Sequence, residues 1–201
     1  REDRWANHSK LAIHSFVEQG YPLRGLNCSI SSEIPQQLGL ASSSAIELAT
    51  AMALRALFAP ELSDRQLIQF LVAGQKSFSG SSPVPVDWIS SLYAQENRFH
   101  IIDPVLQTLK PIEPPLKGYK IFLTDSRVPK IDMDSELKQR EKELKKGLSM
   151  LAGPENTEPT YNDFIKEDLI DILSGLPEQI RRRASHVIQE SARIVNIEET
   201  F

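Results

Sequence analysis

The chain has 201 residues, of which 40% are hydrophobic, and this is enough apolar material for one large domain or for parts of two. Its net charge of −4 gives no general attraction to nucleic acid or to an anionic membrane surface, so we expect neither as a partner. No apolar run approaches the roughly 18 residues that a membrane span needs. The single cysteine, Cys28, cannot form an internal disulfide, which fits a reducing compartment, and we predict a cytoplasmic protein. The sequence starts without Met inside a predicted helix, so we expect the chain to be part of a longer protein.

The first part of the chain combines three predicted helices with one predicted strand. Apolar spacing predicts helices at residues 4–17, 45–58 and 64–78, and a β-like run at residues 26–32. Ser63 is a suitable N-cap for the third helix, because a serine hydroxyl accepts from the free N–H groups of a first turn. Cys28 falls within the β-like run, and we expect it to be packed rather than reactive.

The second part of the chain begins with a small-residue loop and ends in helices. The loop is followed by a short helix, two paired strands, a proline-rich linker and a further strand, predicted at residues 88–93, 98–103, 105–110, 111–118 and 119–126. Three more helices are predicted at residues 134–151, 160–173 and 177–199. The first of these is dense in opposite charges at i,i+4 spacing, which is typical of a solvated helix face.

The stretch at residues 39–44 joins the β-like run to the next helix, and this order of strand, small-residue turn and helix start can hold phosphate. Free N–H groups at a helix N-terminus point outwards, and the helix dipole favours an anion there. The hydroxyls of Ser42, Ser43 and Ser44 can reach phosphate oxygens or Mg²⁺, and Gly39 lets the backbone come close. The alternative is a serine N-cap on a buried helix. The stretch lacks G-x-x-x-x-G-K-[ST], so it is not a Walker P-loop.

The same stretch carries a family resemblance. Pro35, Gly39-Leu40-x-Ser42-Ser43 and Glu47 resemble the second motif of the galactokinases, which belong to the GHMP kinase superfamily. Further matches follow in order along the chain: Arg4-Trp5-Ala6-Asn7, Ser77-Phe78-x-Gly80 with Asp87, Leu123-Thr124-x-Ser126, and Arg182-Arg183-Ala184-x-His186-Val187 with Glu190. Together these points span nearly the whole chain, which makes the resemblance far more specific than one motif.

The resemblance implies the GHMP kinase fold, which is of α/β (α+β) class and has two domains. Residues 1–115 would form part of the N-terminal, ATP-binding domain, and residues 116–201 part of a ferredoxin-like C-terminal domain. The first motif of the family would lie before residue 1, and the third after residue 201. The implied function is phosphorylation of galactose or a related sugar at its anomeric hydroxyl, with ATP and Mg²⁺, by a protein that we expect to be a monomer.

The resemblance also implies a role for each site residue. Asp87 matches the aspartate that the family places beside the sugar hydroxyl, as general base or electrostatic guide, although its position also fits an N-cap. Ser43 and Gln75 match the positions that hold magnesium. The residues matched to the nucleotide phosphates are Gly39, Leu40, Ala41, Ser42, Ser43 and Ser44. Glu47 could approach the same site, but a solvated carboxylate on the helix surface is the simpler prediction.

Several residues depart from the galactokinase pattern. Gln36-Gln37-Leu38 replaces glycine-rich residues, which adds bulk and removes backbone freedom where phosphates would approach. Gln75 replaces the magnesium-binding glutamate with a neutral amide that lacks its charge. These departures leave two alternatives open. One is a galactokinase-like protein that binds sugar or nucleotide for regulation, with weak or no turnover, and the other is a GHMP kinase for a different sugar.

Overall fold

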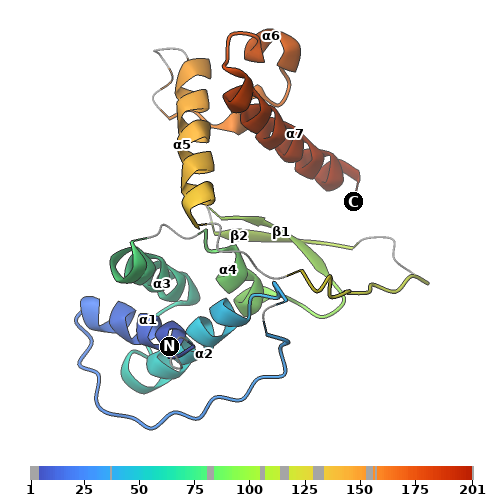
Figure 1. Cartoon of the computed structure of the whole chain (residues 1–201). Helices are drawn as coiled ribbons and strands as arrows, with labels where there is room; N and C mark the ends of the chain where they lie inside the picture. Colours follow the sequence, from blue (N-terminus) through green and yellow to red (C-terminus); the bar gives the residue numbers. More distant parts are fainter. Residues whose placement is uncertain are drawn as a thin grey trace. The chain divides into compact units, whose positions relative to one another are not determined.

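The structure, a computed structural model, describes residues 5–36, 38–80, 84–104, 107–113, 118–128, 134–152, 156 and 158–200. This part of the chain is mostly helical, with one antiparallel pair of strands (Figure 1). No helix within it is both long and apolar enough to cross a membrane. The chain divides into two compact units, Arg1–Asp125 and Ser126–Phe201. The domain limits expected from the sequence, 1–115 and 116–201, remain predictions.

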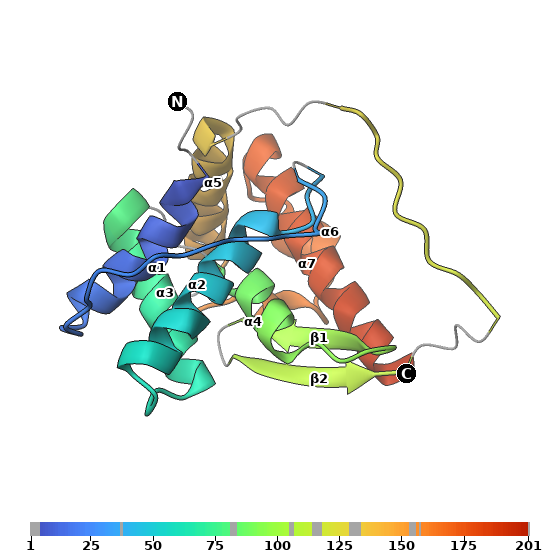
Figure 2. The same cartoon turned by 90° about the horizontal axis from the view of Figure 1, so that it is seen from below.

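The described residues of the first unit include four helices: α1 Ala6–Glu18, α2 Ser42–Phe58, α3 Asp64–Ser79 and α4 Val86–Tyr93. Helix α1 packs against α2 and α3, and α4 packs against α2 (Figure 2). Apolar residues recur at three- and four-residue spacing, so each helix turns one stripe towards a shared core. That core includes Leu11, Phe16, Leu48, Leu54, Leu67, Ile68, Leu71, Trp88 and Ile89.

Two features hold helix α3 in place: a cap at its start and a close contact with α1 in its second half. The Ser63 hydroxyl accepts from the backbone N–H of Gln66, and the Gln66 side chain accepts from the backbone N–H of Ser63, which confirms the predicted cap. Further along, Gly74 lies against α1, and a Cβ built there would stand 2.7 Å from the Cβ of Ser15 and 2.9 Å from its Cα. Only a residue without a side chain allows the two helices to approach this closely.

The short sheet follows α4. Strands β1 Phe99–Asp103 and β2 Thr108–Ile112 pair antiparallel, with Ile101 opposite Lys110. The predicted pairing is confirmed, although β2 begins three residues later than the sequence pattern indicated. Helix α4 packs against β1, so the hairpin extends the core of the first unit.

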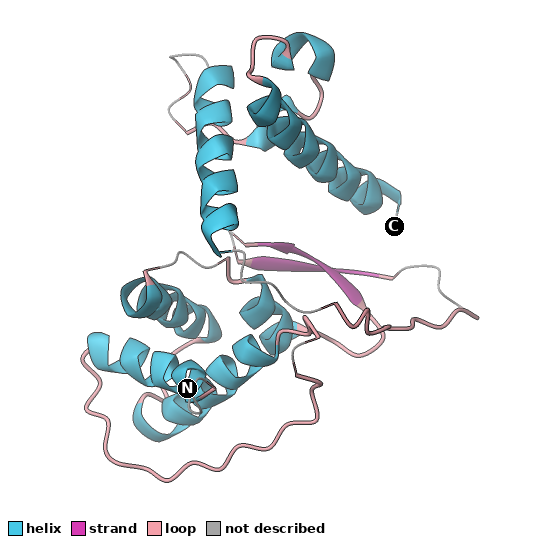
Figure 3. Cartoon of the chain, in the orientation of Figure 1, coloured by secondary structure: helices cyan, strands magenta, loops and turns pink. Residues whose placement is uncertain are grey.

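Two of the predicted strands are wrong. Residues 26–32 and the described loop at 119–126 form no strand (Figure 3), and their large apolar side chains are partly or largely exposed, from 41% for Ile30 to 80% for Phe122. A strand needs a neighbour to pair with its backbone groups, and in the described residues the ladder consists of β1 and β2 alone. Cys28, which we expected to be packed, is exposed in the first of these loops. The described chain is therefore a mostly helical structure with a small sheet rather than a full α/β fold.

The second unit contains α5 Asp134–Leu151, η1 Tyr161–Phe164, α6 Leu169–Leu173 and α7 Glu178–Thr200. Helix α5 packs along α7, over a core of Leu173, Leu176, Ile180, Ala184 and Ile188. The helix predicted at residues 160–173 is divided into η1 and α6. Since the described residues of this unit include no strand, the expected ferredoxin-like arrangement is not seen there.

The charge pattern predicted for α5 is confirmed. Arg140 contacts Glu136, and the Lys145 Nζ lies 2.7 Å from the Glu141 Oε1, both at i,i+4 spacing. Glu143 is the exception on this helix, because it is buried. It accepts hydrogen bonds from Gln139, from Gln179 and from Arg183.

Candidate active site

The start of α2 has an unusual backbone. Gly39 and Ala41 both have positive φ, of 74° and 53°, and the helix begins at Ser42, three residues earlier than predicted. Ala41 occupies the N-cap position and makes no side-chain cap, so the alternative of a serine N-cap is wrong. The hydroxyls of Ser42, Ser43 and Ser44 lie in the first turn instead, among backbone N–H groups that have no acceptor within the helix. A positive φ at alanine is uncommon and costs energy, which makes this turn a feature to explain.

Asp87 lies in the first turn of α4 rather than at its cap. Pro85 is the N-cap residue of α4, so the alternative of Asp87 as an N-cap is also wrong. The Asp87 side chain is exposed, and its Oδ2 accepts a hydrogen bond of 3.3 Å from the Ser44 Oγ. The first turns of α2 and α4 therefore meet, although 43 positions separate the two residues. This contact is the centre of the candidate site.

The other predicted site residues lie on or just before α2 and on α3. Ser43 is exposed on α2, while Leu40, Ala41 and Ser42 are half-buried. Gln75 is half-buried in the second half of α3, and its pairing with Ser43 at a metal ion remains a prediction. Of the residues that depart from the family pattern, Gln36 and Leu38 are exposed, and Gln37 lies outside the described residues. Arg4, which matches the pattern, also lies outside them.

Glu47 was predicted as a solvated helix residue, and the structure corrects this. Its side chain is only 8% exposed and accepts from the Trp88 Nε1 at 2.9 Å, while its other oxygen lies 2.7 Å from the His8 Nδ1. The sequence does indicate this burial through helical spacing, which the prediction did not use. Residues 47, 51 and 54 share one face of α2, and Ala51 and Leu54 belong to the core. A charge on that face should have indicated a buried carboxylate with partners.

Ser77, from the matched Ser-Phe-x-Gly stretch, ties the end of α3 to α1. Its hydroxyl donates to the Glu18 Oε2 at 2.6 Å and lies 2.9 Å from the His14 Nε2. Glu18 and His14 also approach each other within 3.3 Å. Glu18 contacts both the Ser77 hydroxyl and the His14 nitrogen that faces this hydroxyl. In a hydrolase triad the carboxylate contacts the other ring nitrogen, so these three residues do not form a triad. Its effect is to hold the end of α3, from which the chain continues towards Asp87.

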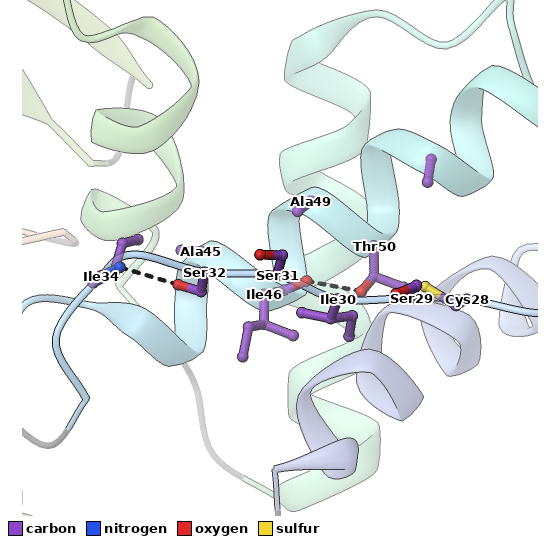
Figure 4. Close-up of a pocket in the computed structure, with 11 residues that line it drawn as sticks. Cys28, Ser29, Ile30, Ser31, Ser32, Ile34, Ala45, Ile46, Ala49 and Thr50 are labelled. Carbon is purple, nitrogen blue, oxygen red and sulfur yellow. Dashed lines mark hydrogen bonds between the residues drawn. The ribbon is translucent and has the colours of Figure 1, made fainter.

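A pocket of about 330 Å³ lies between residues 28–34 and one face of α2 (Figure 4). Ile30, Ile34 and Ile46 contribute apolar side chains, and the Thr50 hydroxyl donates to the Ile46 carbonyl instead of facing a ligand. The Ser32 hydroxyl likewise accepts from the Ile34 N–H. This lining suits apolar contacts better than phosphate, so the anion-holding groups remain those at the helix start.

The donor set can be tested against magnesium and a nucleotide. The predicted metal residues, Ser43 and Gln75, offer a hydroxyl and an amide oxygen, and oxygen atoms are the ligands that Mg²⁺ prefers. No three His, Cys, Asp or Glu side chains gather as a metal site among the residues that can be described. Such a site would therefore depend on hydroxyl, amide and phosphate oxygens, a pattern that fits Mg²⁺ bound together with a nucleotide.

Comparisons with known proteins agree with the motifs. Residues 7–95 match the family model described as GHMP kinases N terminal domain. The chain is 28% identical over 193 residues to galactokinases of Thermotoga neapolitana and Thermotoga maritima, which covers 96% of this chain and 53% of each relative. It is 26% identical over 211 residues to the galactokinase of Bacillus subtilis, which covers the whole chain and 52% of that protein.

The chain thus spans about half the length of the curated relatives it matches. The similarity extends over both compact units, whereas the family model covers helices α1 to α4. The predicted resemblance is confirmed: residues 7–95 match the N-terminal domain model of the GHMP kinases, and nearly the whole chain is similar in sequence to galactokinases.

Proposed function

We propose that this chain belongs to an ATP-dependent sugar kinase, which transfers the γ-phosphoryl group of ATP to the anomeric hydroxyl of galactose or a related sugar. The observation that carries the proposal is the 3.3 Å contact between the Ser44 Oγ and the Asp87 Oδ2. Phosphoryl transfer needs a phosphate cradle beside a group that orients the acceptor hydroxyl. The first turn of α2 and the first turn of α4 supply those two elements side by side.

Each element has a physical role in the proposed reaction. Backbone N–H groups of residues 39–44 and the dipole of α2 attract the nucleotide phosphates, and the Ser42 hydroxyl donates to a phosphate oxygen. The Ser44 hydroxyl has a single proton, which it donates to Asp87 in the structure, so it would have to turn from Asp87 to donate to a phosphate. Ser43 and Gln75 would hold Mg²⁺, which when bound neutralises charge on the β- and γ-phosphates. Asp87 is exposed and accepts the proton of the sugar hydroxyl or orients it towards the phosphorus.

The proposal extends to the full-length protein only by homology. We propose that the full-length protein has the two-domain GHMP kinase fold, is cytoplasmic and acts as a monomer. Galactose is the first sugar to test. The relatives named galactokinase support this choice of sugar.

A second candidate function is supported by Gln75. A neutral, half-buried amide holds Mg²⁺ less strongly than a carboxylate, so a sugar- or nucleotide-binding regulator with weak or no turnover is the alternative. The same site could also serve a GHMP kinase for another sugar.

One assay on the full-length protein distinguishes the kinase from the regulator and also identifies the sugar. ADP release is measured with ATP, Mg²⁺ and a panel of hexoses, and ³¹P NMR identifies the product. We expect a sugar 1-phosphate, with galactose or a close relative as the best acceptor. Tight nucleotide binding without any sugar phosphate would contradict the kinase and favour the regulator. Gln75→Glu is the companion variant, since a restored carboxylate should then raise the affinity for Mg²⁺.

A further inference from the structure

Glu47 joins three helices of the first unit through one buried carboxylate. It stands on α2, one turn beyond Ser43, and its two oxygens contact the Trp88 Nε1 on α4 at 2.9 Å and the His8 Nδ1 on α1 at 2.7 Å. A buried carboxylate is costly unless its oxygens are satisfied. An apolar side chain could fill this position at lower cost, whereas the carboxylate makes directional contacts with its two partners.

Trp88 directly follows Asp87 in α4. Its side chain is 3% exposed, and the indole N–H donates to Glu47, whereas the neighbouring Asp87 faces solvent and Ser44. Helix α4 has only eight residues and no side-chain cap, and a helix of this length is not stable without tertiary contacts. The hydrogen bond to Glu47 adds a directional contact to the packing of Trp88 and Ile89 in the core, and it can select how α4 is rotated against α2.

We infer that Glu47 is a positioning residue, which acts through Trp88 to hold the Asp87 carboxylate beside the first turn of α2. This inference rests on the proposed function for its effect on turnover, but the positioning itself does not need turnover to be observed. Glu47 does not touch the reacting groups in this account. His8 contributes by holding the second carboxylate oxygen.

The test uses four variants of the full-length protein. Glu47→Leu removes both hydrogen bonds, Glu47→Gln keeps an oxygen that can accept from the indole, and Trp88→Phe removes only the indole donor. The control is Glu61→Leu, because Glu61 is also a carboxylate that accepts one side-chain hydrogen bond, from the Tyr21 hydroxyl, but lies beyond the other end of α2. Amide hydrogen exchange of α4 and steady-state kinetics are measured for each.

We expect Glu47→Leu and Trp88→Phe to raise exchange at the α4 amides about tenfold. In Trp88→Phe, which leaves the contact between Glu47 and His8 in place, α1 and α3 should change by less than about twofold. In the same variants kcat should fall about tenfold or more with little change in the KM for ATP, since misplacing a reacting group affects the chemical step. Glu47→Gln should retain most of both properties, and the control should match the wild type.

Two outcomes would overturn the inference, and a third would overturn the proposed function instead. Unchanged exchange in α4 of a folded Trp88→Phe protein would remove the proposed link, whatever the activity. Faster exchange in α4 with unchanged kcat would leave Glu47 as a structural residue only. A wild-type protein without turnover would contradict the proposed function, and the exchange result would still decide whether Glu47 holds α4.

Discussion

Among the residues that the structure describes, each compact unit buries one glutamate, and the partners of the two carboxylates differ. In the second unit, Glu143 is bound by the Gln139 and Gln179 amides and by the Arg183 guanidinium, so its charge is neutralised where α5 meets α7. In the first unit, Glu47 is bound by an indole and an imidazole. Both side chains satisfy the requirement that buried charges have partners. The partner of Glu47, Trp88, directly follows Asp87, which contacts the start of α2, whereas the partners of Glu143 adjoin no residue of the candidate site. Burial alone therefore does not distinguish a structural carboxylate from one that we infer to position a site.

A pair of helical glycines extends this comparison to packing and gives the largest expected effect. A Cβ at Gly74 would meet the backbone of Ser15 at 2.9 Å, whereas a Cβ at Gly147 would meet only side-chain atoms of Ile180 and Tyr161, both at 2.8 Å. We expect Gly74→Ala to lower the free energy of unfolding by about 2–3 kcal/mol, because backbone cannot move aside easily. Gly147→Ala should cost less than about 1 kcal/mol, since alanine also favours the helix.

Denaturant unfolding measures both losses, and hydrogen exchange assigns each one to its unit. Equal losses for the two variants would show that the helices of the first unit can separate as easily as the side chains of the second can move.

Removing Glu143 should have a smaller and purely structural effect. Glu143→Leu leaves the Arg183 guanidinium without this partner, but that side chain is 35% exposed and water can solvate it. We expect a loss of about 1–2 kcal/mol in the free energy of unfolding, below the usual cost of breaking a fully buried pair. Exchange should rise in α5 and α7, and the amides of α4 should keep their protection. Increased exchange in α4 would break the contrast with Glu47.

The helices could be predicted from the sequence because their apolar spacing is a local property. The two wrong strands, at residues 26–32 and 119–126, illustrate the limit of that method. Their apolar residues fit a pleated surface, but a strand depends on a paired neighbour that local spacing does not reveal. Residues such as Phe122 are exposed for that reason.

The candidate site could be predicted only in part from the sequence. The family motifs identified Ser43 and Asp87, yet the contact between Ser44 and Asp87 joins residues 43 positions apart and follows from tertiary packing. The left-handed backbone at Ala41, which starts α2 early, has no signature in the residue type. Glu47 was misjudged because its charge was given more weight than its place on the core-facing side of α2.

The most direct test of the central claim is a single-turnover measurement of phosphoryl transfer with Asp87→Asn in the full-length protein. Asp171→Asn is the matched control, because Asp171 is another exposed aspartate in the first turn of a helix. We predict that Asp87→Asn still binds ATP but transfers phosphate about 10²- to 10⁴-fold more slowly, while the control is unchanged. Transfer by Asp87→Asn at the wild-type rate would contradict the assignment of the active site to the first turns of α2 and α4.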